Sequence, residues 1–364
     1  MPSNIFNNKN VLVTGHTGFK GTWLSLWLSK LGGRIIGVSD QVPTKPAHYE
    51  LIKQYVDKDY RVDIRDLESF KKIVKDETPD LIFHLAAQPI VLKSYEAPLE
   101  TFSVNTMGSA NILETVRNIN HKCSVVMITS DKCYDNVERD AGYYETDRLG
   151  GKDPYSGSKG AAELIIRSYV KSFFNKKDSN VKLGIGRAGN VIGGGDWAKH
   201  RIIPDCIRSW SKNKKPEIRN PLATRPWQHV LEPLSGYLCL ATKLVQNDNL
   251  NGEAFNFGPH DEQNHTVKEL VNELTSHWPG SDWIDTSSKN LTPHEAGLLK
   301  LNCEKAHKML GWKATLNFKE TSHWTAEWYR TYYEKGLEEG LQMTFDQIDN
   351  YMKISKDRNS FSLI

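Results

Sequence analysis

The sequence has few cysteines, and it lacks any segment typical of secretion or of insertion into a membrane. Its five cysteines are scattered and form no CxxC pair, so neither a disulfide framework nor a zinc site is indicated. Residues 1–10 are polar and have no apolar signal core, and no apolar run approaches the roughly 20 residues of a membrane helix. We therefore expect a protein of the reducing cytoplasm, with no metal and no membrane partner.

The chain also lacks an excess of charge of either sign. Its 47 basic and 44 acidic residues give a formal charge of +3, and no long run of one sign occurs. A surface for nucleic acid or for an acidic membrane is therefore not indicated. The small basic surplus suits an anionic small molecule, although plain solubility explains it equally well.

In the first half of the chain, short apolar runs alternate with segments of helical period. The runs predict strands at residues 10–14, 34–38, 81–85, 124–129 and 182–187. Helical spacing of apolar residues predicts helices at residues 22–31, 67–75, 105–117 and 153–174. This alternation is typical of the α/β class, and it predicts a Rossmann-type, doubly wound parallel sheet.

Glycine and proline become frequent after Gly189, and the regular alternation ends there. We therefore predict a Rossmann domain formed by residues 1–190 together with about 228–258. Residues 191–227 and about 259–335 are expected to form a smaller C-terminal substrate-binding domain. Residues 336–364 are polar and are expected to be a C-terminal extension in the form of a loosely attached helix.

Three glycines stand between the first predicted strand and the first predicted helix. Gly15, Gly18 and Gly21 have GxxGxxG spacing. Glycine lets the backbone approach a pyrophosphate, and the N-terminus of the following helix offers free N–H groups and a positive dipole. Glycine-rich turns are common, but the strand before this one and the helix after it favour a dinucleotide site.

Two carboxylates follow neighbouring strands of this predicted sheet. Asp40 lies at the end of the second strand and suits the ribose hydroxyls, and the absence of arginine in that stretch favours NAD over NADP. Asp63 can accept a hydrogen bond from an adenine amino group, or it can belong to the N-terminal cap region of the next helix. The sequence leaves these two roles of Asp63 open.

Tyr155 and Lys159 form a YxxxK pair near the start of a predicted helix. A spacing of four places both side chains on one face, one turn apart. A free phenol, with a pKa of about 10, is a weak base at neutral pH, and a neighbouring ammonium lowers that pKa. The pair can then take a hydroxyl proton while a hydride leaves for nicotinamide. The alternative is a surface helix face without chemistry.

Ser130, Asp131 and Lys132 follow the predicted strand at residues 124–129. Polar side chains at the carboxyl end of a parallel strand point into the ligand crevice. Ser130 can hydrogen-bond the reacting hydroxyl, and Asp131 and Lys132 can serve as an acid and a base. A loop salt bridge is the competing interpretation.

Together these segments resemble the extended short-chain dehydrogenase/reductase superfamily, from Val11 to about Tyr329. Within it, the sequence is most similar to the 4,6-dehydratases that act on CDP-glucose. The segments that carry this resemblance are TGHTGFKG (14–21), HLAAQP (84–89), TSDKCYDN (129–136), GGKDPYSGSKGAAEL (150–164), RAGNVIGGGDWA (187–198) and RNPLATRPWQHVLEPLSGYL (219–238).

The resemblance implies NAD as the cofactor and CDP-glucose or a related sugar nucleotide as the substrate. The implied cycle is oxidation at C4, loss of water across C5 and C6, and return of the hydride to C6. The resemblance also implies a role in deoxysugar biosynthesis for lipopolysaccharide. It further implies a homodimer or a dimer of dimers, without a nucleic acid partner.

The motifs and the resemblance together indicate three sets of site residues. The expected cofactor-binding residues are Gly15, Thr17, Gly18, Phe19, Lys20, Gly21, Asp40, Asp63, Ile64, Leu85, Ala86, Ala87, Gln88, Asn105, Tyr155, Lys159 and Arg187. The expected substrate-binding residues are Gln88, Ser130, Asn190, Arg201, Arg219 and Arg225. The expected catalytic residues are Ser130, Asp131, Lys132, Tyr155 and Lys159.

One position departs from most sugar-nucleotide 4,6-dehydratases, which resemble this chain but have an Asp-Glu pair in place of Asp131 and Lys132. A lysine becomes a base only when burial or a nearby cation lowers its pKa. We hypothesise that Asp131 protonates the C6 oxygen and that neutral Lys132 takes the C5 proton. Alternatively, a charged Lys132 stabilises the enolate.

Other functions remain open on the same scaffold. A 4-epimerase or another NDP-hexose 4,6-dehydratase would share the glycine turn and the Tyr155 and Lys159 pair. A non-catalytic, NAD-sensing module is a further alternative, because a fold does not determine a function. Such modules usually lose the tyrosine or the lysine, and both residues are present here.

Overall fold

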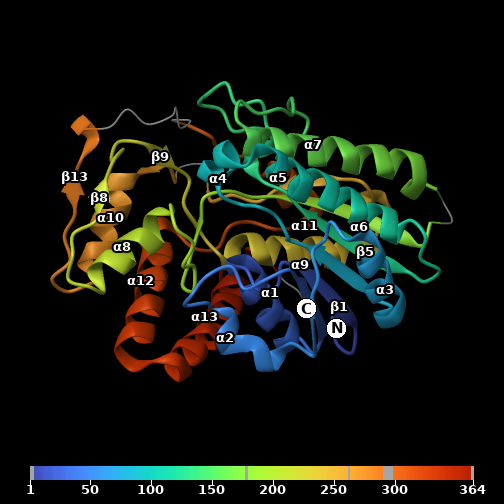
Figure 1. Ribbon diagram of the computed structural model, residues 1–364, viewed down its shortest axis with the longest axis horizontal. Coiled ribbons are helices and arrows are strands. Elements are labelled where there is room, and N and C mark those ends of the chain that lie inside the picture. Colours follow the sequence, from blue (N-terminus) through green and yellow to red (C-terminus); the bar gives the residue numbers. More distant parts are fainter. Residues whose placement is uncertain (1–3, 177–178, 261–262, 290–297, 362–364) are drawn as a thin grey trace.

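A seven-stranded parallel sheet forms the centre of the computed structural model, which describes residues 4–176, 179–260, 263–289 and 298–361 (Figure 1). Its strands are β1 (Asn10–Thr14), β2 (Arg34–Ser39), β3 (Lys58–Arg61), β4 (Leu81–His84), β5 (Cys123–Ile128), β6 (Val181–Arg187) and β11 (Ala254–Asn256). The strand order is β11-β6-β5-β4-β1-β2-β3, and each neighbouring pair is parallel. The predicted doubly wound α/β fold is confirmed. Its order reverses between β1 and β4, which is where ligands bind in such sheets.

Helices cover both faces of the sheet. The helices are α1 (Phe19–Lys30), α2 (Tyr49–Ile52), α3 (Leu67–Glu77), α4 (Val91–Glu96), α5 (Pro98–Phe102), α6 (Gly108–Val116), α7 (Pro154–Tyr169), α8 (Ile202–Trp210), α9 (Leu231–Gln246), α10 (Val267–Ser276), α11 (Glu304–Leu310), α12 (Phe318–Lys335) and α13 (Leu337–Asp357). One buried cluster joins the sheet to α3, α6 and α7, and a second joins it to α1 and α9. Because both faces are covered, the strands inside the sheet are buried along nearly their whole length, whereas the edge strand β3 is polar and largely exposed.

Three predicted helices differ from the observed ones at their ends. The helix predicted from residue 22 begins three residues earlier, because Gly18 is its N-cap and the glycine-rich turn continues directly into α1. The segment predicted as one helix at 105–117 is a π-helical turn, η2 (Ser103–Met107), followed by α6. The end of the helix predicted to reach residue 174 is likewise a π-helical turn, η4 (Val170–Phe174).

The segments expected to form a second domain gather beside the sheet, on the left of Figure 1. They contain α8, α10 and short strand pairs, one of which extends to residues 228–229, in the segment predicted to belong to the Rossmann domain. The pairs are β7 (Val191–Ile192) with β10 (Gln228–His229), β8 (Glu217–Ile218) with β13 (Ile284–Asp285), and β9 (Thr224–Arg225) with β12 (His265–Thr266). The short helical turns are η1 (Lys53–Tyr55), η3 (Asp131–Cys133), η5 (Asp248–Leu250) and η6 (Ser287–Lys289).

The C-terminal helix is firmly packed, so the prediction of a loosely attached extension is wrong. Ile348 and Tyr351 of α13 are fully buried, and the Tyr351 hydroxyl donates to Glu232 Oε2 at 2.8 Å. Glu232 also accepts from the backbone N–H of Thr315. Although α13 is polar overall, its few large apolar residues lie on one buried face, which composition alone does not reveal.

Candidate functional site

The glycine-rich turn leaves a narrow cradle between β1 and α1. Gly15 has a φ of 73°, and a Cβ there would lie 2.7 Å from the backbone nitrogen of Ala86. A Cβ on Gly21 would lie 2.0 Å from the Gly15 carbonyl oxygen. No side chain caps the N-terminus of α1 at Gly18. The free N–H groups of this helix and the close backbone approach fit a dinucleotide pyrophosphate.

A substitution at Gly18 tests cofactor binding without disturbing the fold. A Cβ on Gly18 would meet no atom closer than the Gly15 carbonyl oxygen, at 3.4 Å. We expect Gly18→Ala to keep its melting temperature within a few degrees and to bind NAD roughly 10-fold more weakly, since a methyl group blocks close approach of the pyrophosphate. Gly21→Ala is the structural control and should lower stability. Cofactor affinity by calorimetry and thermal unfolding of both variants test this. Unchanged NAD affinity in Gly18→Ala would place the pyrophosphate elsewhere.

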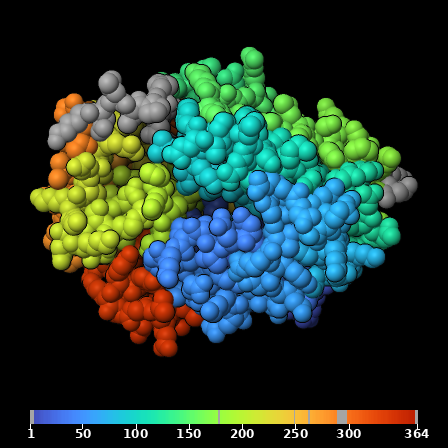
Figure 2. All heavy atoms as spheres, in the orientation of Figure 1, coloured from blue at the N-terminus to red at the C-terminus, as the bar shows by residue number. Residues whose placement is uncertain are grey.

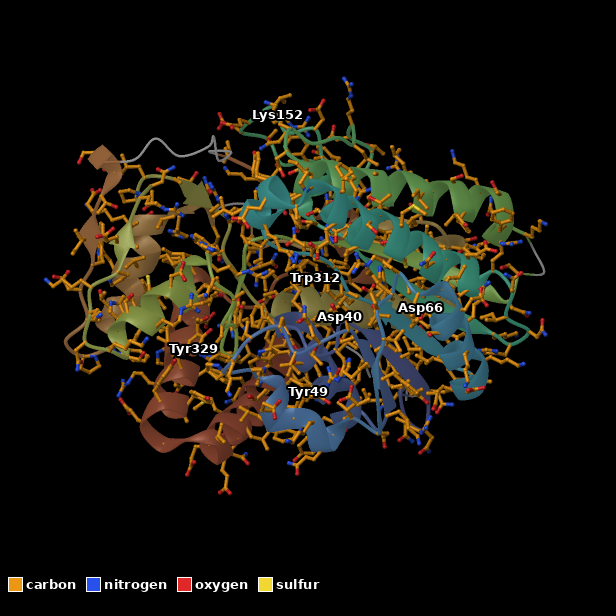
Figure 3. The ribbon with its side chains drawn as sticks, viewed as in Figure 1. Asp40, Tyr49, Asp66, Lys152, Trp312 and Tyr329 are labelled. Atoms are coloured by element: carbon orange, nitrogen blue, oxygen red, sulfur yellow. The ribbon has the colours of Figure 1, made fainter. Side chains whose placement is uncertain are left out.

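The two carboxylates predicted at the adenosine end lie beyond β2 and β3. Asp63 forms an ion pair with Arg65, with 2.5 Å between Oδ2 and Nη2, and hydrogen bonds from Arg65 lower the pKa of Asp63. The N-cap of α3 is Asp66 rather than Asp63. Asp40, labelled near the centre of Figure 3, is exposed and accepts from the backbone N–H of Gln41 at 2.8 Å. Each Asp63 oxygen accepts two contacts from Arg65, whereas Asp40 keeps free acceptor sites. The adenosine contacts of both stay predictions.

The predicted catalytic tyrosine stands in the first turn of α7. Asp153 caps this helix, its Oδ1 accepting from the Ser156 backbone N–H at 3.0 Å, and Pro154 occupies the first helical position. Tyr155 and Lys159 are both buried, and the Lys159 Nζ lies 6.0 Å from the centre of the Tyr155 ring. The predicted placement of this pair on one helix face is therefore confirmed.

The environment of Tyr155 includes a cation that the sequence did not indicate. Burial raises the pKa of Tyr155 to about 12, while the Ser130 hydroxyl and the charge of Arg201 lower it. Burial also lowers the pKa of Lys159 to about 8. Arg201 thus opposes the effect of burial on the phenol, and the predicted effect of Lys159 stays a prediction.

Asp131 lies at the bottom of the crevice at the carboxyl end of β5. Its Oδ1 accepts from the Ser130 hydroxyl at 2.8 Å, and its Oδ2 accepts from the Asn190 Nδ2 at 3.3 Å. A Cβ on Gly189 would overlap this carboxylate, 2.1 Å from its carbon. Asp131 lines a small cavity with Gly189, Asn190, Pro226, Gln228, Gly258, Pro259 and Leu301. The predicted acid therefore faces an open space next to the tyrosine.

Lys132 follows directly in the short turn η3. It is partly buried, and its backbone N–H donates to the Ser130 hydroxyl oxygen at 3.2 Å. This hydrogen bond restrains the Ser130 hydroxyl. The predicted base role of the Lys132 ammonium stays a prediction.

The predicted substrate arginines occupy three different settings. Arg201 pairs with Asp196 at 2.7 Å, and Asp196 is held in turn by Tyr329, which projects from α12 in Figure 3. Arg225 donates to the Thr224 carbonyl at 2.8 Å, and Arg219 is exposed. Figure 2 shows that the chain around residues 200–225, in yellow-green, meets the blue and cyan segments around a hollow. Arg201 is the arginine that the structure brings to Tyr155.

Several predicted ligand contacts belong instead to the internal structure. The Arg187 guanidinium is fully buried and pairs with Glu163 through two contacts of 2.8 Å, which gives it a structural role, and its predicted cofactor contact stays a prediction. The Gln88 amide bonds the backbone of Ile90 and the Thr101 hydroxyl, which leaves it poorly placed for substrate. The Asn105 amide bonds the Gln88 backbone.

The remaining predicted cofactor residues line the turn through backbone or packing contacts. The Thr17 hydroxyl donates to the Gln41 carbonyl at 2.7 Å, and the Ala86 N–H donates to Thr14 Oγ1 at 3.2 Å. The Ile64 side chain is buried against the α6 helix. Phe19, Leu85 and Ala87 lie in the same turns.

Sequence reasoning missed the direction of the Lys20 side chain, and it missed Tyr237 as a neighbour of the crevice. The Lys20 Nζ lies 3.5 Å from the Tyr237 hydroxyl, and burial lowers the pKa of Lys20 to about 7. Lys20 interacts electrostatically with Asp131, and so does Tyr237. The only available sequence signal was a lysine at a position inside a glycine-rich turn.

Within the described ranges, no helix combines the length and hydrophobicity needed to cross a bilayer. The same part of the chain contains no cluster of three histidine, cysteine or carboxylate side chains arranged to hold a metal ion.

The sequence matches proteins of known activity over most of its length. A model of the GDP-mannose 4,6-dehydratase family matches residues 12–324. CDP-glucose 4,6-dehydratase of Salmonella typhimurium is 44% identical over 355 residues, which cover 96% of this chain and 98% of that protein. CDP-paratose 2-epimerase of Salmonella typhi is 26% identical over 277 residues, covering 68% of this chain and 78% of that protein.

Solved structures share the fold at low sequence identity. A dTDP-glucose 4,6-dehydratase from Bacillus anthracis, solved in complex with NAD, matches with a TM-score of 0.72 at 21% identity, over 90% of this chain and 98% of that chain. A UDP-glucose 4-epimerase from Thermotoga maritima, solved with UDP-glucose, matches with a TM-score of 0.75 at 21% identity, over 88% of this chain and 98% of that chain. At these identities the likeness shows the fold alone.

Proposed function

The chain belongs to the GDP-mannose 4,6-dehydratase family, and from this premise we propose that it removes water from CDP-glucose to give CDP-4-dehydro-6-deoxyglucose. The cofactor of this proposed reaction is NAD. The observation that carries the proposal is buried Asp131, which lines a cavity at the carboxyl edge of the sheet, is hydrogen-bonded to Ser130 and acts electrostatically on buried Tyr155.

We assign the steps of the proposed reaction to residues of this chain. Tyr155 takes the proton of the C4 hydroxyl, with Lys159 and Arg201 as the cations that favour its phenolate. Bound NAD, held in the glycine cradle, supplies a hydride acceptor for C4 and a hydride donor for C6. Asp131 protonates the C6 oxygen as it departs, because its carboxyl group lines the cavity beside Tyr155.

Removal of the C5 proton requires a further base, and we assign it to Lys132. Lys132 follows Asp131 directly in η3, at the carboxyl end of β5, which supports this assignment. The ammonium must lose its proton before it acts as a base, whereas a charged Lys132 would stabilise the enolate. The pH dependence of C5 deuterium exchange in Lys132→Met and Lys132→Glu separates these two roles. Unimpaired C5 deuterium exchange in Lys132→Met would exclude both roles of Lys132.

The substrate pyrophosphate is assigned to Arg201, Arg225 and Asn190, on the segments predicted to form the smaller domain. A planar guanidinium matches phosphate oxygens in a two-point geometry. The electrostatic interaction of Arg201 with Tyr155 supports this assignment, since the substrate phosphates and the reacting sugar belong to one molecule.

The test is to offer purified protein CDP-, dTDP-, GDP- and UDP-glucose and to weigh the products. We expect CDP-glucose to lose one water, with the other nucleotides converted more slowly. An unchanged mass together with a changed sugar configuration would indicate a 4-epimerase. Retention of NAD without conversion of any of the four would indicate a non-catalytic protein.

We also propose that two copies of the chain pair through α5, η2 and α7. These elements lie side by side in Figure 1 and expose large apolar side chains, with Leu99 85%, Met107 55% and Leu164 58% exposed. Adjacent exposed apolar residues mark an interaction surface, and a two-fold axis would let the same patch cover itself.

The dimer is tested with charged substitutions on this patch. We expect Leu99→Asp/Leu164→Asp to be a folded monomer by light scattering, because two buried carboxylates per subunit are costly to desolvate. Leu222→Asp is the matched control, since Leu222 is 75% exposed and lies outside the patch. A dimeric double variant, or a monomeric wild type, would overturn this assignment.

A further inference from the structure

A short turn after β6, formed by residues 189–190, closes on the carboxylate that the proposed reaction uses as its acid. Asp131 Oδ2 accepts from the Asn190 Nδ2 at 3.3 Å. A Cβ on Gly189 would lie 2.1 Å from the Asp131 carboxyl carbon and 2.2 Å from each carboxyl oxygen. Only a residue without a Cβ therefore lets the 189–190 turn approach this buried carboxylate, and the position of the carboxylate depends on the position of the turn.

Gln228 of β10 bonds both residues of the 189–190 turn. Its backbone N–H donates to the Asn190 carbonyl at 3.2 Å, and its side-chain Nε2 donates to the Gly189 carbonyl at 2.9 Å. The same Nε2 donates to the Phe257 carbonyl at 3.0 Å, directly after β11. The support matters because Asn190 has a φ of 53°, in a region that residues with a side chain rarely adopt. One amide, 1% exposed, thus ties the turn to the neighbouring strand.

The Gln228 side chain belongs to the wall of the cavity beside the acid. Asp131, Gly189, Asn190 and Gln228 all line that cavity. Gln228 Oε1 is buried and has no hydrogen-bond partner among the described residues. The amide is therefore held by the two bonds that its nitrogen donates, and a substitution by methionine, which has a similar length, removes these two bonds and no others of the side chain.

We propose that Gln228 is a positioning residue, which holds the acid Asp131 in place by fixing the 189–190 turn. This inference rests on the proposed dehydration. In that reaction the C6–O bond breaks, its electron pair stays on oxygen, and Asp131 supplies the proton that makes the leaving group water. An acid must lie within hydrogen-bond reach of this oxygen, and a misplacement of about 1 Å slows such a step by roughly 100-fold.

The proposed role concerns a single step of the reaction. Oxidation at C4 uses Tyr155 and leaves the cofactor reduced until the hydride returns to C6. Loss of water uses Asp131 and takes place between these two events. With the acid out of place, the enzyme stops with an oxidised sugar and with NADH. A general loss of folding or of substrate binding slows the oxidation itself, so the two effects differ in their spectra.

The experiment mixes CDP-glucose with the NAD-loaded wild type and with Gln228→Met, and it follows NADH absorbance and product mass. We expect Gln228→Met to form product about 100-fold more slowly, while its initial oxidation at C4 stays within about threefold of the wild type. NADH should therefore accumulate to a higher level in Gln228→Met than in the wild type.

Gln347→Met is the matched control for the loss of a buried amide. Gln347 of α13 is 2% exposed, and its Nε2 donates to the Trp324 carbonyl at 2.8 Å. Its Oε1 also has no partner among the described residues. Gln347→Met should lower the melting temperature, as Gln228→Met does, and should keep the wild-type level of NADH.

A second substrate isolates delivery of the proton. CDP-6-deoxy-6-fluoroglucose loses fluoride with the electron pair of the C6–F bond, and fluoride needs no proton to leave at neutral pH. We expect Gln228→Met to convert this analogue at a rate within about threefold of the wild type. The defect should thus be confined to the substrate whose leaving group needs the acid.

Asn190→Gly provides a second variant, which tests the last contact between the 189–190 turn and Asp131 even if Gln228→Met does not fold. Glycine keeps the positive φ and removes the amide that bonds Asp131. We expect the same accumulation of NADH from CDP-glucose and the same recovery with the fluoro analogue. Both substrates carry the same pyrophosphate, so a phosphate contact of Asn190 affects them equally.

The outcomes separate this inference from the proposed function. Equal slowing of both substrates in Gln228→Met, without accumulation of NADH, would overturn the positioning role and leave Gln228 as a purely structural residue. Wild-type loss of water in Asn190→Gly would also overturn it. A wild type that neither dehydrates CDP-glucose nor releases fluoride from the analogue would overturn the proposed function, and this inference with it.

Discussion

Tyr155→Phe is expected to reduce kcat by roughly 10³- to 10⁴-fold, the largest effect of any single substitution on catalysis. Phenylalanine keeps the buried ring but removes the oxygen that takes the C4 hydroxyl proton. Product formation is measured by mass spectrometry, with cofactor content and thermal unfolding measured on the same preparation.

The stability of Tyr155→Phe should change little. The Tyr155 side chain is 8% exposed, and the ring keeps its packing when only the hydroxyl is removed. Tyr144→Phe is the control, since Tyr144 is 47% exposed and lies outside the crevice. A variant that retains more than about a tenth of the wild-type rate would show that another group takes the proton. The reaction proposed here would then have no starting point.

The sheet could be predicted from the sequence because its pattern is local. Strands buried on both faces must be short apolar runs, and each predicted run lies within about one residue of an observed strand. The crossover helices between them impose parallel pairing. The order of the strands follows from this chirality and from the glycine turn after β1.

The placement of Tyr155 and Ser130 followed from the same local signals. Tyr155 lies in the first turn of a helix whose start is marked by Asp153 and Pro154. Ser130 and Asp131 follow a strand whose carboxyl end is the edge where ligands bind. Local caps and strand ends therefore position these catalytic side chains.

The parts that could not be predicted depend on contacts between distant segments. Arg201 meets Tyr155 only because α8 begins beside the crevice, and the burial of α13 depends on Glu232 of another helix. The Lys20 side chain turns toward Tyr237, more than 200 residues away in sequence. No periodicity within one segment encodes such contacts.

Arg187 is the clearest example of a contact that the sequence did not predict. Its substitution should have the largest effect on stability. We expect Arg187→Met to lower the free energy of unfolding by about 3–5 kcal/mol, because it leaves the Glu163 carboxylate buried without its cation. Both side chains are fully buried, and the guanidinium also donates to the Tyr134 hydroxyl at 2.7 Å. Burial raises the pKa of Glu163, but Arg187 outweighs it and holds the pKa below its usual value. The pair therefore stabilises the fold above the pKa of an unfolded glutamate, and that contribution is lost as pH falls through the lower folded pKa.

Urea unfolding of three variants tests whether Arg187 is structural or a cofactor ligand. Arg187→Met/Glu163→Leu should recover much of the stability that Arg187→Met loses, since no unpaired charge remains. Arg117→Met is the control, because its pair with Glu114 is partly exposed and should contribute less than about 1 kcal/mol. NAD affinity of the folded double variant should match the wild type. A stable Arg187→Met that fails to bind NAD would instead support the original sequence prediction of a direct cofactor contact.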